Sequence, residues 1–203
     1  NSNNLRTGEL MDSDWMAIQE AEEQLSRINL YIDDTSGIKL GEIKTKVTKL
    51  KARDPNLALV VIDYLGLITL NNPKADNRQN IDEISRSLKG LARDLNIAII
   101  CLSQLSRANE KEKRRPIMSD LRDSGSIEQD ADTVMFLYRE NYQKSKEEDN
   151  KKVNEIDESP FGKMEVIEVN LIKNRNGSTG LIKLAFMMNI GKFTELSGEE
   201  QFQ

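Results

Sequence analysis

The strongest constraint on the fold is a short apolar run that ends in a carboxylate. Residues 57–65 read LALVVIDYL, with three β-branched residues in a row before Asp63. An apolar run of this length without alternation is typical of a strand buried on both faces, as in a parallel sheet. A carboxylate at the carboxyl end of such a strand lies in the crevice where open α/β sheets bind ligands.

Four or more apolar residues followed by aspartate also form the Walker B pattern. In that motif the aspartate holds Mg²⁺, usually through water, beside the β- and γ-phosphates of a nucleotide. The alternative is a structural strand whose terminal Asp63 only caps the next turn. The run by itself favours neither interpretation, so the choice depends on the rest of the chain.

Helices and further apolar strands follow the Asp63 strand in alternation. Apolar residues spaced three and four apart predict a long helix over residues 81–95, and the apolar runs at 97–102 and 133–138 predict two more buried strands. This order of strands and helices is typical of a parallel sheet with right-handed crossovers.

The flanking segments complete an α/β pattern. Helices are predicted over residues 11–28, with Trp15 as a core or interface anchor, and over 40–50, and a short strand is predicted over 30–33. Strands over 164–172 and 181–187, with Asn-Gly in the turn between them, predict a β-hairpin. The charged segment 141–162 is interpreted as a surface insertion.

Composition narrows the classes of function. The chain has no histidine and a single cysteine, Cys101, so histidine-based catalysis and zinc clusters are excluded. The formal net charge of −5 argues against a generally basic nucleic-acid binder but leaves binding through a local patch open. No apolar run reaches the length of a membrane span and the N-terminus has no signal-like core, so we expect a cytoplasmic protein with a reduced, buried Cys101.

Polar residues follow two neighbouring strands of the predicted sheet. Asp63 follows the first strand and Gln104 the second. Because the carboxyl ends of parallel strands meet at one edge, both residues are expected to face the same crevice. Asp63 can hold a metal ion there, and the amide of Gln104 can hydrogen-bond a γ-phosphate or the attacking water. Two unrelated strand ends would give the same pattern.

Five stretches occur in the order and spacing of a known family. They are YIDDT at 31–35, VIDYL at 61–65, EISRSLK at 83–89, LSQLSR at 102–107 and SGSIEQDAD at 124–132. Together they resemble the replicative hexameric DNA helicases of the DnaB type, from Leu5 to about Leu196. The resemblance implies a RecA-like α/β fold, with a mainly parallel sheet flanked by helices and a C-terminal β-hairpin. It also implies ATP-dependent translocation on single-stranded DNA that unwinds the duplex during replication.

The resemblance implies roles for matching residues. Asp63 corresponds to the Walker B aspartate that holds Mg²⁺, and Gln104 to the sensor of the γ-phosphate. Lys173 and Arg175 correspond to the hairpin residues that reach the ATP of the neighbouring subunit, with Arg175 as the arginine finger. All four are thereby implied as catalytic and ATP-binding residues. Without the resemblance, Lys173 and Arg175 would be ordinary polar residues of a hairpin.

The resemblance also implies partners. Arg122, Asp123 and Gly125 match a central-channel loop that tracks single-stranded DNA, in which an arginine can pair a phosphate while a glycine lets backbone N–H groups approach the strand. The loop over 69–80 is a weaker second candidate. Further implied partners are the neighbours in a homo-hexamer and, for the full-length protein, a primase and a helicase loader. The implied cofactors are ATP and Mg²⁺.

The chain departs from the family at two points. Gly66 stands where the family usually has glutamine, and no Gly-x-x-x-x-Gly-Lys-Ser/Thr stretch occurs. In the family that stretch precedes the residues matched here. The expectation is therefore a single RecA-like domain over residues 1–203, truncated on its N-terminal side and inactive as an ATPase by itself.

Two other functions compete with this interpretation. The first is a non-catalytic ring subunit or interaction protein, derived from such a helicase, that modulates an intact one. A P-loop encoded in frame upstream would favour the enzyme, and a start codon at residue 1 would favour the modulator. The second is a RecA-like ATPase of recombination or clock type, against which the 124–132 stretch argues.

Overall fold

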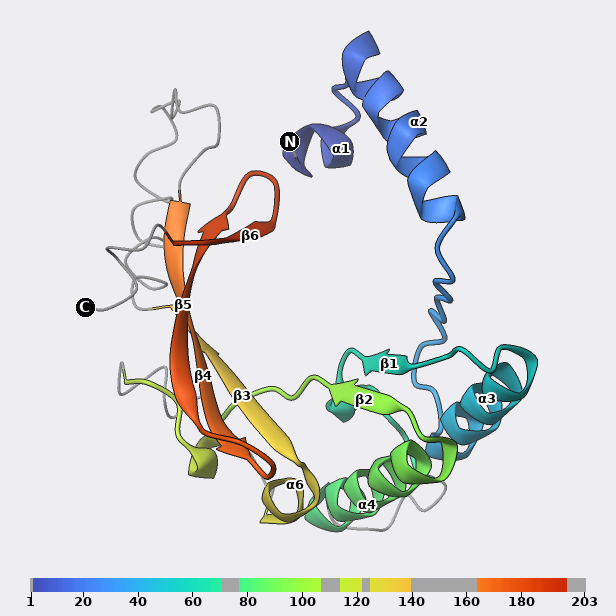
Figure 1. The fold of residues 1–203 in the computed structure, drawn as a ribbon, viewed down its shortest axis with the longest axis vertical. Helices are drawn as coiled ribbons and strands as arrows, with labels where there is room; N and C mark the ends of the chain where they lie inside the picture. The colour runs from blue at the N-terminus through green and yellow to red at the C-terminus, as the bar shows by residue number, and fades with distance from the viewer. Residues whose placement is uncertain (1, 71–76, 107–113, 122–124, 140–163, 197–203) are drawn as a thin grey trace. The chain divides into compact units, whose positions relative to one another are not determined.

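The structure is a computed structural model that describes residues 2–70, 77–106, 114–121, 125–139 and 164–196 (Figure 1). The chain divides into two compact units. One comprises Asn1–Asp34, Leu137–Asn170 and Leu181–Gln203, and the other comprises Thr35–Phe136 and Leu171–Gly180. The predicted insertion over 141–162 lies outside the described residues, and so do residues 71–76 of the predicted loop over 69–80. Residues 77–80 belong to a helix, so the loop prediction is wrong there.

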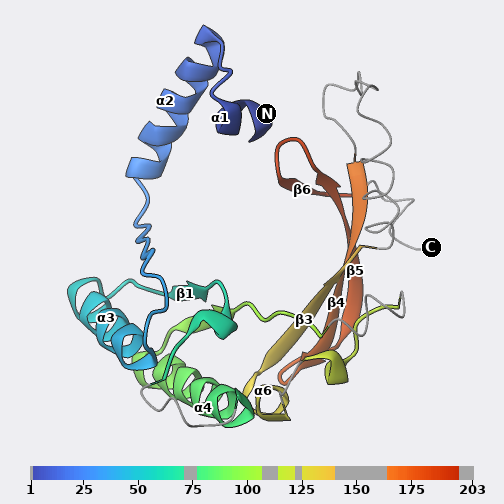
Figure 2. The ribbon, with the colours of Figure 1, turned by 180° about the vertical axis from the view of Figure 1, so that it is seen from behind.

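A parallel pair of strands is the centre of the second unit. Strand β1 (Leu59–Ile62) pairs in register with β2 (Ala98–Cys101), so that Ile62 lies opposite Cys101. The helix α4 (Asn77–Leu95) connects the two strands and packs with α3 (Leu40–Arg53) on one side of them (Figures 1 and 2). The strand–helix–strand order predicted from the apolar runs is confirmed.

The core of this unit lies between the helices and the strands. Its buried members are Leu40, Ile43, Val47, Leu65, Ile68, Ile84, Leu88, Leu91 and Ile97. They come from α3, from α4, from the segment that contains the 3-10 helix η1 (Leu65–Leu67), and from the residue just before β2. Burying an aliphatic side chain of this size contributes roughly 1.5–3 kcal/mol, so this cluster holds β1 and β2 against the two helices.

The prediction that the Asp63 strand is buried on both faces is wrong. Val60 and Ile62 pack toward the core, whereas Leu59 is 47% and Val61 58% exposed on the opposite face. An apolar sequence permits burial on two faces, but burial also requires a layer on each side, and among the described residues α3 and α4 supply one. Cys101 lies on the packed side, where burial raises the pKa of its thiol to about 11.

A second sheet contains the C-terminal strands. Its order is β3 (Thr133–Tyr138), β4 (Met164–Asn174), β5 (Gly180–Met187) and β6 (Lys192–Glu195), and β5 and β6 are antiparallel. The predicted strands are confirmed as strands, and β6 is an addition to them. The prediction that the 133–138 strand is buried holds for one face alone, because Met135 is 55% and Leu137 60% exposed on the other. However, β3 pairs with β4 and not with the parallel pair. The α/β class is therefore confirmed, while the finer RecA-like arrangement stays a proposal.

The N-terminal segment contains α1 (Ser2–Thr7) and α2 (Asp12–Ser26). The helix predicted over 11–28 is confirmed, but Trp15 is 55% exposed, so it is not a core anchor, and its interface role stays a prediction. The strand predicted over 30–33 is wrong, because these residues adopt no regular secondary structure. No helix among the described residues combines the length and the apolar character needed to cross a membrane.

Candidate nucleotide and arginine-finger site

The carboxyl edge of the parallel pair carries Asp63 and Gln104. The N–H of Leu102 donates to the carbonyl of Ile62 at 2.9 Å, and the N–H of Leu65 donates to the carbonyl of Leu102 at 2.9 Å. These bonds hold the two strand ends together just where Asp63 leaves β1 and Gln104 follows β2. Both side chains are exposed. The parallel pairing on which their juxtaposition depends is confirmed, and their chemical roles stay predictions.

The residues at this edge fit Mg²⁺ that is held mainly by phosphates and water. In the described part of the chain, no three or more His, Cys, Asp or Glu side chains gather into a metal cluster. Mg²⁺ keeps several waters and is usually bound through one or two carboxylates together with substrate phosphates. Asp63, as a single exposed carboxylate, is compatible with that kind of site.

The ring of Tyr64 lies close to the glycine at position 66. A Cβ added to Gly66 would lie only 2.8 Å from Cε2 of Tyr64, a separation that two carbon atoms do not adopt without moving apart. The ring of Tyr64 therefore occupies the space beside Gly66, and a glutamine there would require the ring to move.

Lys173 and Arg175 lie against the C-terminal end of helix α6 (Gly125–Asp130). Figure 1 shows α6 beside the turn between β4 and β5. Nζ of Lys173 donates to the carbonyl of Glu128, and Nη2 of Arg175 donates to the carbonyl of Gln129 at 2.8 Å. Backbone carbonyl groups at the end of a helix carry partial negative charge and attract cations. The helix end therefore holds Lys173 and Arg175 in one place.

Asp132 supplies the negative charge of this cluster. Its Oδ1 lies 3.0 Å from Nη1 of Arg175, and its Oδ2 accepts a hydrogen bond from Nζ of Lys89 in α4. The hydrogen bond from Lys89 holds the pKa of Asp132 below its ordinary value, and the charges of Lys89, Arg175 and Lys173 lower it further. The carboxylate is therefore ionised at neutral pH, while the side chains of Arg175 and Asp132 remain 47% and 48% exposed.

The residues predicted to contact DNA are only partly described. Arg122 and Asp123 lie outside the described residues, and Gly125 is the first residue of α6. Their DNA-binding role stays a prediction. The candidate DNA loop thus leads into α6 at Gly125, and the candidate finger contacts the other end of the same short helix through the carbonyl of Gln129.

The sequence did not identify two members of the cluster, Asp132 and Lys89. Each belongs to a stretch that carried the family resemblance, but nothing in the pattern indicates that they meet across a separation of 43 residues. The carbonyl groups of Glu128 and Gln129 are equally invisible in the sequence, because every residue has one. The one available signal was the conspicuously polar character of the 124–132 stretch.

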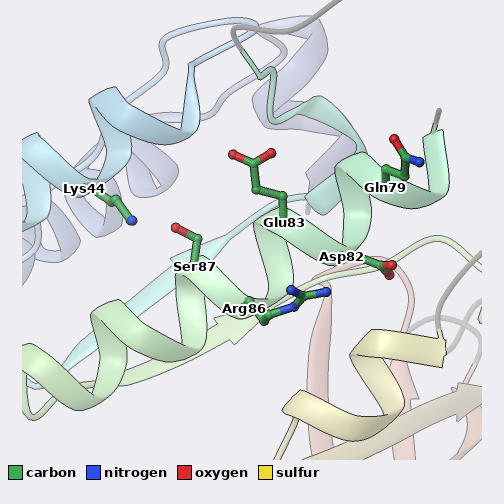
Figure 3. Close-up of a pocket in the computed structure, with 6 residues that line it drawn as sticks. All are labelled: Lys44, Gln79, Asp82, Glu83, Arg86 and Ser87. Atoms are coloured by element: carbon green, nitrogen blue, oxygen red, sulfur yellow. The ribbon is translucent and has the colours of Figure 1, made fainter. Parts of the chain in front are cut away.

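A separate polar cavity of about 580 Å³ opens between α3 and α4 (Figure 3). In Figure 3, Lys44 of α3 points toward α4, which provides the other labelled side chains. The cavity is lined by Lys44, Gln79, Asp82, Glu83, Arg86 and Ser87. None of the residues predicted for the nucleotide edge or for the finger cluster is among them, so this cavity is distinct from both, although Gln79 belongs to the second candidate DNA segment over 69–80.

Comparison with known proteins gives a consistent result. A family model described as the DnaB-like helicase C terminal domain matches residues 1–195. The replicative DNA helicase DnaC of Bacillus subtilis (strain 168) is 46% identical over 198 residues, which is 97% of this chain and 40% of that protein. The replicative DNA helicase DnaB of Geobacillus stearothermophilus is 45% identical over 198 residues, with the same coverage of both proteins.

Solved structures agree with these sequence matches. A DnaB-like replicative helicase, whose structure was solved together with its interactions with primase, gives a TM-score of 0.82 at 34% identity, covering 97% of this chain and 45% of that one. A second solved structure, an ATPase domain, superposes with a TM-score of 0.80 at 34% identity, covering 97% and 66%. The chain thus spans about 40% of the length of the curated relatives named above.

Proposed function

Because this chain belongs to the family of DnaB-like helicase C-terminal domains, we propose that it is the motor domain of a ring-forming replicative DNA helicase. The motor moves along single-stranded DNA and unwinds the duplex, driven by ATP with Mg²⁺. The observation that carries the proposal is the family match over residues 1–195, supported by 46% identity to a replicative helicase. The chain spans about 40% of that relative, so the activity of the whole protein is part of the proposal.

The nucleotide side of the proposed site consists of Asp63 and Gln104. ATP with Mg²⁺, when bound, supplies the phosphoryl group that is transferred to water. Asp63 holds the metal ion at the exposed edge of the parallel pair, and Gln104 hydrogen-bonds the γ-phosphate or orients the attacking water. The parallel register of β1 and β2 supports this assignment, because it brings the two positions to the same edge.

The other side of the proposed site comes from the neighbouring subunit of a homo-hexamer. Lys173, near the end of β4, and Arg175, in the turn between β4 and β5, reach the neighbour's ATP. A guanidinium offers a planar fork of donors that suits the charge spread over a transferring phosphoryl group. Arg175 remains 47% exposed although it is held by α6, which is what a donor to a second subunit requires.

The proposed track is single-stranded DNA. Arg122 pairs a phosphate, and Asp123 and Gly125 complete the loop that follows the strand. Contacts to phosphate carry affinity without sequence information, which suits a motor that acts on every sequence. In the full-length protein, a primase and a helicase loader are further proposed partners, and a relative whose structure was solved together with its interactions with primase supports the first of these.

Mixed rings of the assembled helicase that carries this chain test the proposal. Asp63→Ala subunits lack the metal ligand but keep the finger, and Arg175→Ala subunits lack the finger but keep the metal ligand. Each variant alone should hydrolyse little ATP, and mixing them should restore activity at interfaces that pair an intact Asp63 with an intact Arg175. Arg93→Ala is the matched control, because Arg93 is an 82% exposed arginine of α4 outside the site.

If the subunits must hydrolyse ATP in strict succession, every site has to be intact and the mixed rings would show no recovery even with a finger in trans. A titration covers that case. Arg175→Ala subunits are added to wild-type subunits in increasing ratio. If activity falls only in proportion to dilution, and mixed rings show no recovery, Arg175 does not act on a neighbour. If Arg175→Ala alone keeps full activity, Arg175 is an ordinary surface residue.

A further inference from the structure

Asp132 connects three elements at the finger cluster: α4 through Lys89, the end of α6, and the hairpin through Arg175. We propose that Asp132 is a positioning residue, which fixes the guanidinium of Arg175 in the orientation that meets the neighbouring subunit's nucleotide. The inference rests on the proposed function of Arg175. It adds a role for a carboxylate that does not itself touch the nucleotide.

The geometry fixes Arg175 at three points. Nη1 lies against Oδ1 of Asp132 at 3.0 Å, Nη2 donates to the carbonyl of Gln129 at 2.8 Å, and the backbone N–H donates to the carbonyl of Asp132 at 2.8 Å. Because the guanidinium is planar and rigid, its two anchored nitrogens together with the anchored backbone N–H restrict the orientation of the whole group. The remaining N–H donors of Arg175 therefore point in a defined direction.

Lys89 makes Asp132 a fixed anchor. It binds the second oxygen of the carboxylate, so the two oxygens are divided between a lysine and an arginine. Lys89 also belongs to a helix whose neighbouring residue, Leu88, is only 6% exposed in the core. The carboxylate is therefore tied to a firmly packed helix of the unit, as the supporting residues of a precise site need to be.

The partial exposure of the Asp132–Arg175 pair leaves the guanidinium accessible to a phosphate of a second subunit. An ion pair between half-exposed groups is weakened by solvent, so Asp132 orients Arg175 without locking it away from a phosphate. A long side chain without this anchor would spread over several rotamers and lose conformational entropy when it meets the nucleotide. Asp132 removes part of that loss before ATP hydrolysis begins.

The expected effect is on turnover and not on ATP binding, because a finger acts mainly in the transition state. In the assembled helicase, Asp132→Asn should lower kcat by roughly 10- to 100-fold with little change in KM for ATP. Asp132→Ala should lower kcat at least as much. The matched control is Asp94→Asn, an exposed aspartate of α4 that lies 3.5 Å from Arg93 and should keep wild-type turnover.

A double-mutant comparison separates positioning from a general structural role. If Asp132 acts through Arg175, then Asp132→Asn has no further effect on single-turnover hydrolysis in an Arg175→Ala background. If the two losses multiply, or if Asp132→Asn keeps wild-type kcat while Arg175→Ala is inactive, the positioning role is wrong and the proposed function stands. Full turnover in Arg175→Ala would overturn the finger assignment and the positioning role with it.

Discussion

Two aspartate–arginine pairs of the second unit differ sharply in their surroundings. Asp120, in the 3-10 helix η2 (Met118–Asp120), is 3% exposed and accepts from both Nη1 and Nη2 of Arg114, at 2.5 and 2.8 Å. It also accepts from the N–H of Ile117 at 2.8 Å. Asp132 is half-exposed, makes one contact of 3.0 Å with the side chain of Arg175, and gives its other oxygen to a lysine.

This difference in burial indicates that the Asp120–Arg114 pair maintains the fold, whereas the Asp132–Arg175 pair leaves the guanidinium of Arg175 accessible. A buried carboxylate needs all its hydrogen-bond partners, because removing one leaves an uncompensated charge in a poorly solvated place. A half-exposed pair contributes little to stability. Arg175 can therefore offer its remaining N–H donors to a phosphate while Asp132 holds it, whereas both Nη atoms of Arg114 donate to Asp120.

The largest expected effect is the loss of ATP turnover when Arg175, the arginine of the half-exposed pair, is replaced. In the assembled helicase, Arg175→Ala should lower ATP hydrolysis by roughly 10³- to 10⁵-fold, the range of arginine fingers supplied by a second subunit. Arg175→Lys should not restore it, because an ammonium lacks the planar fork. Steady-state phosphate release measures the turnover of both variants, and thermal unfolding checks that each variant is folded. Near wild-type turnover of the lysine variant would show that only charge matters at this position.

The next effect distinguishes the two aspartates by stability. Asp120→Ala should lower the free energy of unfolding by about 3 kcal/mol, because it takes the carboxylate partner from Arg114 in a partly buried place. Asp132→Ala should lower it by less than about 1 kcal/mol. Urea denaturation of wild type and both variants gives the two values. Equal losses would remove the distinction between a structural pair and an accessible one.

Most helices and strands were predictable from local sequence patterns. Apolar residues at helical spacing indicated α4, and an apolar run indicated β3 with the bounds that the structure has, because these signals depend on residues close in sequence. Burial was less predictable. Leu59 and Val61 look like core residues, yet their exposure depends on which layers cover the sheet. Pairing of β3 with β4 depends likewise on segments far apart in the chain.

The candidate site shows the same division. The common edge of Asp63 and Gln104 followed from parallel topology, which the strand and helix order already indicates. The cluster of Asp132 with Lys89 and Arg175 could not be derived, because charged residues on separate elements follow no period that reports their contact. Sequence reasoning thus proposed the finger through family resemblance and missed the carboxylate that holds it.

A smaller effect is expected at a third arginine, Arg122, whose proposed phosphate belongs to DNA. Arg122→Ala should weaken binding of single-stranded DNA about equally for all sequences, because contacts to phosphate carry no base information. The slope of log K against log salt should become shallower by roughly one unit for the lost contact. Fluorescence titrations with several oligonucleotides at several salt concentrations measure both, and a loss confined to one sequence would contradict phosphate tracking.

The smallest effect is the pH dependence of the two aspartates. The hydrogen bond from Arg114 lowers the pKa of Asp120, and the hydrogen bond from Lys89 lowers the pKa of Asp132. A carboxyl group whose folded pKa lies below its unfolded value, roughly 3.9, stabilises the fold above that value and loses this contribution as the pH falls through the folded pKa. Both pairs therefore contribute fully at neutral pH and weaken in acid.

Stability measured against pH then compares the pairs directly. The difference in free energy of unfolding between wild type and Asp120→Asn should be constant above roughly pH 5 and should shrink below about pH 4 as Asp120 takes up a proton. The corresponding difference for Asp132→Asn should follow the same direction with a smaller amplitude, because solvent screens a half-exposed pair. A difference that grows in acid would reverse the sign of the pKa shift, and a larger amplitude for Asp132 would show that its ion pair maintains the fold after all.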